Sequence, residues 1–184
     1  MANIPAYNTQ NISIGPGVVY LGLSGTTPTH DIGAIDKAGV DINLSQTYLE
    51  VFQGSPKALA KQFKTSEDLE VVITGLEWNL TDLAIALGAG VTTSSASQDT
   101  FTFGGDPNTS ILAVKINHTM PIGHTISIYI WQAQVSGKWA IKMAQDTLHT
   151  FPFTFKALVS TLAWDNVTVL ATGAQLFKIV RQKT

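Results

Sequence analysis

A two-residue alternation of apolar and polar side chains runs through much of the chain and limits its fold more than any other feature. In residues 125–131 three isoleucines share one face of an extended chain, and Ser, Tyr and Trp side chains occupy the other face. Residues 151–156 alternate in the same way, and Pro152 there favours a strand start or a sheet edge because proline has no N–H to donate. Strands are also predicted at 18–23, 101–103, 111–116, 138–141, 167–170 and 175–180.

Turn residues between these segments indicate which strands pair. A Gly-Gly-Asp-Pro-Asn run predicts a hairpin with a wide loop between 101–103 and 111–116. A Ser-Gly turn predicts that 138–141 returns along the preceding strand. The last two segments, 167–170 and 175–180, are predicted to pair with each other. All these connections are short, so the expected sheets are antiparallel.

One segment has the spacing of a helix instead. The apolar residues that share one face of this helix are Leu80, Leu83, Ala84 and Leu87. Asn79 is a good N-cap, Asp82 lies in the first turn where the helix dipole favours an acid, and Gly88 can end the helix. The predicted fold class is therefore mainly β, with two packed antiparallel β-sheets in a sandwich or barrel, flanked by one short α-helix at about 80–88. We expect a single domain over 1–184.

The chain carries few charges for its size. Charged residues make up 13% of it, which is about half the share of roughly 25% that is usual in soluble proteins. A compact monomer of this mass exposes roughly 8,600 Å², and 11 basic and 13 acidic residues cover such a surface thinly. We expect much of the surface to be covered by other copies of the chain. The alternative is a monomer with a neutral polar surface rich in Ser, Thr, Asn and Gln.

Composition excludes several classes of function. The chain has no cysteine, which excludes disulfides, thiolate chemistry and cysteine zinc sites. A net charge of −2 argues against a protein that grips nucleic-acid phosphates. Residues 116–137, a long stretch without Asp, Glu, Lys or Arg, contain too many polar residues to span a membrane. Residues 1–5 lack a charged and an apolar region, so we expect no secretory signal and a cytosolic site of synthesis.

No set of residues has the spacing of a catalytic or metal site. The four histidines fit no common ligand pattern, and neighbours such as His30 and Asp31 point opposite ways on an extended chain. The acids between 67 and 82 follow three lysines and are interpreted as a solvated or interfacial charge pattern. Four tryptophans could form a sugar-stacking platform, although core and interface positions are more typical of such residues. We expect no enzyme activity and no cofactor.

A long block of the chain resembles a known family. It comprises YLEVFQGSPK at 48–57, KQFKTSEDLEVVI at 61–73 and LEWNLTDLAIALG at 76–88. This block is similar to the major tail proteins, or tail tube proteins, of tailed bacteriophages. In these proteins a strand ending near Gln and Gly leads into a long loop, then a Val-rich strand with acids, then a short helix ending in Leu-Gly. Residues 31–33 and 39–42 and the segment 151–158 resemble the family more loosely.

The resemblance implies a structural virion protein. Its copies would form hexameric rings by joining their inner sheets, and the rings would stack into a hollow tube through which phage DNA passes. It implies a tape-measure protein and tail terminator or tip proteins as partners, transient passage of DNA without specific binding, and no membrane insertion. It also implies a location in the virion tail after assembly in the host cytoplasm. We favour a long, non-contractile siphophage tail.

The resemblance also points to a segment at about 53–66 as the loop that contacts the next ring. This loop has little apolar material and should be mobile in a free subunit. The lysines within it would meet acidic partners. The residues assigned to this contact are Gln53, Gly54, Ser55, Pro56, Lys57, Lys61, Phe63 and Lys64.

Two other functions stay open at this point. The subunit could build the inner tube of a contractile tail or of a tail-like secretion device, which a sheath partner would reveal. A carbohydrate-binding β-sandwich is an alternative from another class. It would be a soluble monomer whose Trp fluorescence responds to glycans.

Overall fold

The computed structural model describes residues 15, 17–105, 109–137, 139–141, 145–146 and 148–182. The N-terminal residues 1–5, which bear on the expected absence of a secretory signal, lie outside the described residues. So do residues 106–108 of the predicted wide loop and Lys138 of the predicted return strand.

The described elements are ten strands and one helix. In chain order they are β1 (Val18–Leu23), β2 (His30–Asp31), β3 (Ile35–Gln53), β4 (Ala58–Gly75), α1 (Leu80–Leu87), β5 (Val91–Ser94), β6 (Asp99–Thr102), β7 (Leu112–Thr119), β8 (Thr125–Val135), β9 (Phe151–Leu158) and β10 (Phe177–Gln182). Eight strands form one antiparallel sheet with the order β2-β1-β7-β8-β9-β4-β3, and β10 pairs with β8 beside this path. Strands β5 and β6 form a separate two-stranded sheet. The predicted mainly β class with one short helix is confirmed.

Strand β8 joins the two halves of the large sheet. Its first part, from Thr125 to Ile130, pairs with β10, whereas its last part, from Gln132 to Val135, pairs with β9. Strands β1, β7 and β8 form one layer, and strands β9, β4 and β3 continue from the end of β8 into the other layer. The two packed layers are thus halves of one sheet that share a strand.

The main hydrophobic core lies between these layers and the helix. The period-two pattern places alternate side chains inward: Val19 and Leu21 from β1, Val71 and Ile73 from β4, with the phenylalanines of β9 beside them. Pro152 lies where β9 pairs with β4 but not yet with β8, so it sits on a locally free edge, as predicted. The strand predicted from the alternation of residues 151–156 is therefore confirmed, and it lies in the core.

Helix α1 begins and ends where the sequence predicts. The Asn79 side chain accepts hydrogen bonds from the backbone N–H groups of Thr81 and Asp82, at 3.0 and 3.4 Å. Gly88 ends the helix in the left-handed region, with φ of 63°, and a Cβ there would lie 3.0 Å from the Ser110 carbonyl oxygen. Both the conformation and the close approach of Ser110 favour glycine at this position.

Three predicted pairings are wrong. Residues 101–103 do not pair with 111–116: β6 pairs with β5, and β7 pairs with β1 and β8. Residues 139–141 form no strand, and the chain returns along β8 at β9 instead. Residues 167–170 make only one isolated bridge, between Leu162 and Val169, while β10 pairs with β8.

The pairing errors share a physical reason. Alternation identifies a strand, but the partner is chosen by burial against strands far away in sequence. Strand β7, for example, pairs with β1 across about ninety residues of chain, and both strands bury their alternate residues in the core. No local turn signal records such a partner.

Candidate assembly interface

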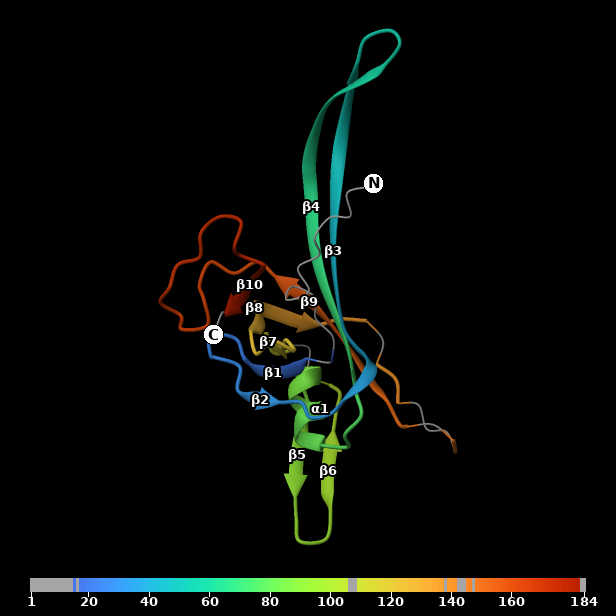
Figure 1. Ribbon diagram of the computed structural model, residues 1–184. Coiled ribbons are helices and arrows are strands. Elements are labelled where there is room, and N and C mark those ends of the chain that lie inside the picture. Colours follow the sequence, from blue (N-terminus) through green and yellow to red (C-terminus); the bar gives the residue numbers. More distant parts are fainter. Residues whose placement is uncertain are drawn as a thin grey trace, which may run out of the picture.

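A long hairpin formed by β3 and β4 projects from the body (Figure 1). The two strands have 19 and 18 residues, against a typical five or six, and are joined by a turn at residues 54–57. From Leu44 to the tip and back to Asp68, every residue is exposed. At about 3.3 Å per residue, this distal part reaches about 30 Å. We call residues 44–68 the arm.

The arm corrects the loop expected at 53–66. Only Gly54, Ser55, Pro56 and Lys57 form the turn, whereas Lys61, Phe63 and Lys64 lie on β4 and pair with Val51, Leu49 and Tyr48 of β3. Gln53 is the last residue of β3 and pairs with Ala58. The scarcity of apolar residues in this segment predicted a loop, but the cross-strand hydrogen bonds of the backbone make it a strand without any core. Two register shifts, at Thr47/Tyr48 and Val51/Phe52, mark irregularities in the ladder.

One face of the arm carries a row of polar contacts. Glu67 accepts hydrogen bonds from Lys64 at 2.7 Å and from Gln46 at 2.9 Å. Tyr48 donates to Gln46 at 2.6 Å on the same face. The bond from Lys64, and then that from Gln46, holds the pKa of Glu67 below its ordinary value, and the bond to Glu67 raises the pKa of Lys64. These contacts fix the side chains of the middle of the arm without any burial.

Toward the tip, the side chains on this same face change from polar to apolar. Gln62 donates to Glu50 at 2.8 Å, and beyond that pair Phe52 and Leu59 oppose each other next to the turn. The two apolar side chains are 53% and 49% exposed. The tip therefore ends in an apolar pair that no described residue covers.

The other face of the arm is apolar in its outer half. Leu49 and Phe63 are cross-strand partners, and Val51 lies two residues further out on β3. All three are more than 40% exposed. The ammonium group of Lys61 lies 4.5 Å from the centre of the Phe63 ring, a cation–π contact. Sequence reasoning assigned Phe63 to the contact but missed Leu49 and Val51, although their alternation outside any core was a signal.

The arm also leaves hydrogen-bonding groups free. Within the described part of the chain, strand β3 pairs only with β4, so no described strand covers its other edge, and the outer half of β4 has no partner there except β3. Long exposed edge strands are a template for pairing with another chain. A two-stranded hairpin standing alone is marginally stable in water. The arm thus combines exposed apolar faces with a strand edge that no described strand pairs.

Helix α1 packs on the core, with one correction to the predicted face. Leu83 and Leu87 are buried, and Leu80 packs against the core from the helix start. Ala84 is half-buried and lines a surface pocket, whereas Ala86 is buried in its place. The buried stripe is rotated toward Ala86 because Asp82 also turns inward, to a partner on β2.

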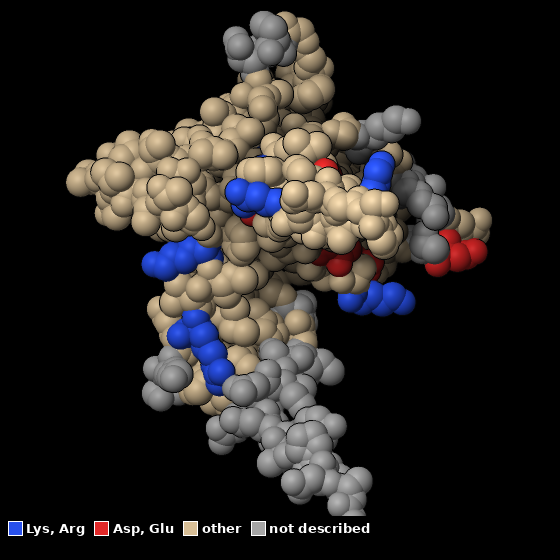
Figure 2. All heavy atoms as spheres, turned by 90° about the horizontal axis from the view of Figure 1, so that it is seen from above, with Lys and Arg blue, Asp and Glu red and all other residues tan. Residues whose placement is uncertain are grey.

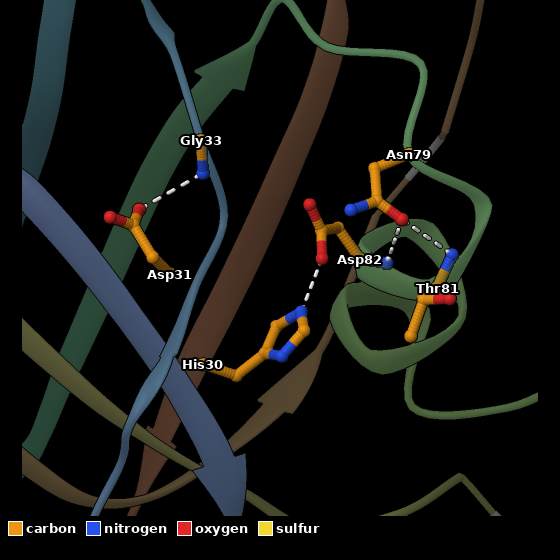
Figure 3. A network of polar contacts seen from close by, with 6 residues as sticks. All are labelled: His30, Asp31, Gly33, Asn79, Thr81 and Asp82. Atoms are coloured by element: carbon orange, nitrogen blue, oxygen red, sulfur yellow. Dashed lines mark hydrogen bonds and ion pairs between the residues drawn. The ribbon is translucent and has the colours of Figure 1, made fainter.

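That partner is His30. The His30 Nε2 atom and the Asp82 carboxylate are in direct contact across the gap between β2 and α1 (Figure 3). Asp82 is 8% exposed. Neighbouring Asp31 points away and accepts a hydrogen bond from the Gly33 N–H at 3.0 Å. The pair ties the short edge strand to the helix, since a buried carboxylate needs a hydrogen-bond donor.

The tryptophans do not form a platform. Trp131 and Trp164 are buried against each other, with ring centres 5.4 Å apart, and both donate to backbone carbonyls, of Ala174 and Ile130. Trp78 packs on the Phe151 ring at 4.6 Å, far along the chain from that pair. Trp139 packs against the main core. All four rings thus make packing contacts, and Trp78, at 48% exposed, is covered the least.

The charged side chains are sparse and scattered. Figure 2 shows a face on which isolated Lys, Arg, Asp and Glu side chains stand among uncharged ones, with no continuous basic or acidic patch. Among the described residues no group of three His, Asp or Glu could hold a metal ion. No helix in the described part of the chain is long and apolar enough to cross a lipid bilayer.

Comparisons with known proteins find matches among solved structures. No protein-family model matches the chain, and no curated protein matches it. Among solved structures, the chain is similar to a chain in the tail of an empty GTA particle, computed with helical refinement and C6 symmetry. The TM-score is 0.47 with 8% sequence identity, over 78% of this chain and 92% of the other. At that level of similarity, the function has to be argued from the residues of this chain.

Proposed function

We propose that this chain is a structural protein that assembles with copies of itself into the hollow tail tube of a tailed phage. The observation that carries the proposal is the arm: a hairpin of about 30 Å with exposed apolar side chains on both faces and an unpaired edge on β3. A monomer gains nothing from such an element. A subunit that pairs with its neighbours gains a large contact surface.

The energetic scale supports an obligate contact. The seven half-exposed apolar side chains of the arm are Leu44, Tyr48, Leu49, Val51, Phe52, Leu59 and Phe63. Covering the remaining exposed half of each contributes about 1 kcal/mol. The sum is large enough to offset the cost of association when each subunit makes several such contacts.

The sparse charge supports the same proposal. A subunit in a closed ring within a stack is covered at its sides, top and bottom, so a chain with 13% charged residues is adequately solvated there. A net charge of −2 suits a tube that lets DNA pass without binding it. Residues 48–88 resemble tail tube proteins, and this resemblance implies the arrangement of the copies: hexameric rings that stack into a non-contractile tail.

The proposal includes the partners and the place that the resemblance implies. The tube would form in the host cytoplasm around a tape-measure protein, be closed by terminator and tip proteins, and end in the virion. The chain would act as a scaffold and a conduit, not as an enzyme. The carbohydrate-binding alternative gains no support, since the indole N–H groups of Trp131 and Trp164 donate hydrogen bonds to backbone carbonyls inside the protein.

Electron microscopy of negatively stained protein tests the proposal. The purified chain is examined over a concentration series, with its mass measured by light scattering. We expect rings or hollow tubes that lengthen as concentration rises. A monomer at every concentration, both alone and after addition of tail tip complexes as an initiator, would contradict self-assembly.

A further inference from the structure

The two ends of the molecule carry charges of opposite sign. The outer part of the arm, residues 51–63, contains Lys57 and Lys61 and no acid. At the other end of the molecule lie α1 and the β5–β6 hairpin (Figure 1). Residues 65–114, which include both elements, contain no Lys or Arg. The tip thus carries two lysines, and the exposed acid of α1 and the β5–β6 hairpin is Asp99.

A groove lies at the acidic end. It has a volume of about 470 Å³ and is formed between the first turn of α1 and the β5–β6 hairpin. Trp78, Asn79 and Thr81 line one wall; Thr93 and Asp99 line the other. The Asp99 side chain is exposed and has no ion-pair partner among the described residues. The N–H groups at the start of α1 are already capped by Asn79, so the acid on the opposite wall sets the charge of the groove.

The tip and the groove also match in their apolar parts. Phe52 and Leu59 stand together on one face of the tip. Trp78 is 48% exposed at the rim of the groove and offers an indole that can receive them. Lys57, on the turn itself, would then reach Asp99. Aromatic and apolar residues at the centre of a contact, with an ion pair beside them, are the usual composition of a protein interface.

We infer that the arm tip of one copy docks in the groove between α1 and the β5–β6 hairpin of the next copy along the axis. The inference rests on the proposed function and names the surface that receives the arm. Because the tip and the groove are at opposite ends of one chain, the contact is head-to-tail and leaves a free tip and a free groove after every addition. Such a contact extends a stack without limit, whereas a self-complementary contact would stop at a dimer.

Charge reversal tests the ion pair within the contact. Lys57→Glu should raise the protein concentration needed for tube formation at least roughly tenfold, because like charges would then face each other. Asp99→Lys should do the same. The double variant Lys57→Glu/Asp99→Lys should recover most of the loss, since the pair is restored in the opposite sense. The matched control is Lys178→Glu on β10, an exposed lysine outside both surfaces, which should assemble like the unaltered chain.

Cysteine cross-linking tests the contact itself, and the absence of native cysteine makes it clean. Ser55→Cys at the tip and Thr93→Cys in the groove are combined in one chain and treated with a short bifunctional thiol reagent. We expect a ladder of dimers, trimers and longer covalent multimers. Ser55→Cys paired with Val167→Cys, which lies on an exposed loop elsewhere, should give no ladder.

The outcomes separate this inference from the function it rests on. Tubes that form normally without a 55–93 ladder, or a double charge variant that stays as impaired as the single ones, would overturn the groove as receptor and leave the tail tube proposal standing. A chain that forms neither tubes nor a ladder would overturn both.

Discussion

The same pair of strands behaves differently at its two ends. At the root of β4, Leu69, Val71 and Ile73 alternate with half-buried residues and are almost fully buried. Along the arm, Leu59 and Phe63 on the same strand are nearly half exposed. The fully buried apolar residues of the root lie on one side of the strand, whereas the arm has exposed apolar residues on both sides. The root thus contributes to the core, whereas the arm leaves its apolar residues exposed.

The largest expected effect is on the body. Leu83→Asp places an unpaired charge under α1, and burial of such a charge costs several kcal/mol. We expect no soluble folded protein, measured as the yield of monodisperse chain and its circular dichroism. Thr81→Asp on the exposed side of the same first turn should fold normally, because an acid there is favoured by the helix dipole. A stable, ring-forming Leu83→Asp chain would show that the helix does not face the core.

The second prediction removes the outer arm. Because Leu49 and Phe63 are cross-strand partners, deleting residues 54–62 leaves residues 50–53 as a four-residue turn between them. The shortened chain should keep the melting temperature of the full chain to within a few degrees, since no core residue is lost.

This deletion should abolish long tubes in electron micrographs. If the shortened chain formed normal tubes, the proposed role of the arm in assembly would be wrong. Unfolding of the shortened chain would contradict the division between root and arm instead.

The third prediction compares two leucines of β4. Leu69→Ala should lower the free energy of unfolding by about 3 kcal/mol, because the side chain is fully buried. Leu59→Ala should lower it by about 0.5 kcal/mol at most, and should instead weaken assembly. Chemical denaturation of dilute protein gives the first quantity, and the concentration threshold of tube formation gives the second. Equal losses of stability in the two variants would contradict the difference between the core position Leu69 and the arm position Leu59.

How far the sequence predicts each region follows from the range of the interactions involved. Helix α1 was predicted with its cap and its end because Asn79, Asp82 and Gly88 act within one turn of it. Single strands such as 18–23 and 151–156 were predicted because alternation is local. Their partners were not, because pairing depends on residues up to about a hundred positions away.

The strand in the outer arm is not predicted by the sequence. Residues 58–66 have no core to alternate against, so their pattern resembled that of a loop, and only pairing with β3 reveals the strand. The Asp82 contact with His30 was also missed, since it joins residues 52 positions apart on different elements. Lys64 is predicted to meet an acid in the contact with the next ring, whereas the acid that it contacts within the chain, Glu67, lies on its own strand.

The smallest expected effect concerns that pair. The folded pKa of Glu67 is lowered, so its contribution to stability is present above the unfolded value and is lost as pH falls through the folded one. The folded pKa of Lys64 is raised, so its contribution is lost only as pH rises through that value, above the ordinary 10.5. The pair is therefore intact at neutral pH.

Carbon-13 NMR titration of the Glu67 carboxyl measures this effect directly. We expect its midpoint below the ordinary 4.5, and an upward movement in Lys64→Ala. Because both groups are solvent-exposed, the melting temperature should hardly change. An unchanged midpoint in Lys64→Ala would show that the contact does not persist in solution.

Hydrogen–deuterium exchange on dilute and on assembled protein separates the arm from the root. We predict that assembly slows exchange across residues 44–68, where the edge of β3 and both apolar faces become covered, and leaves residues 69–75 as protected as in the free chain. Assemblies in which residues 44–68 exchange as fast as in the dilute protein would contradict this prediction.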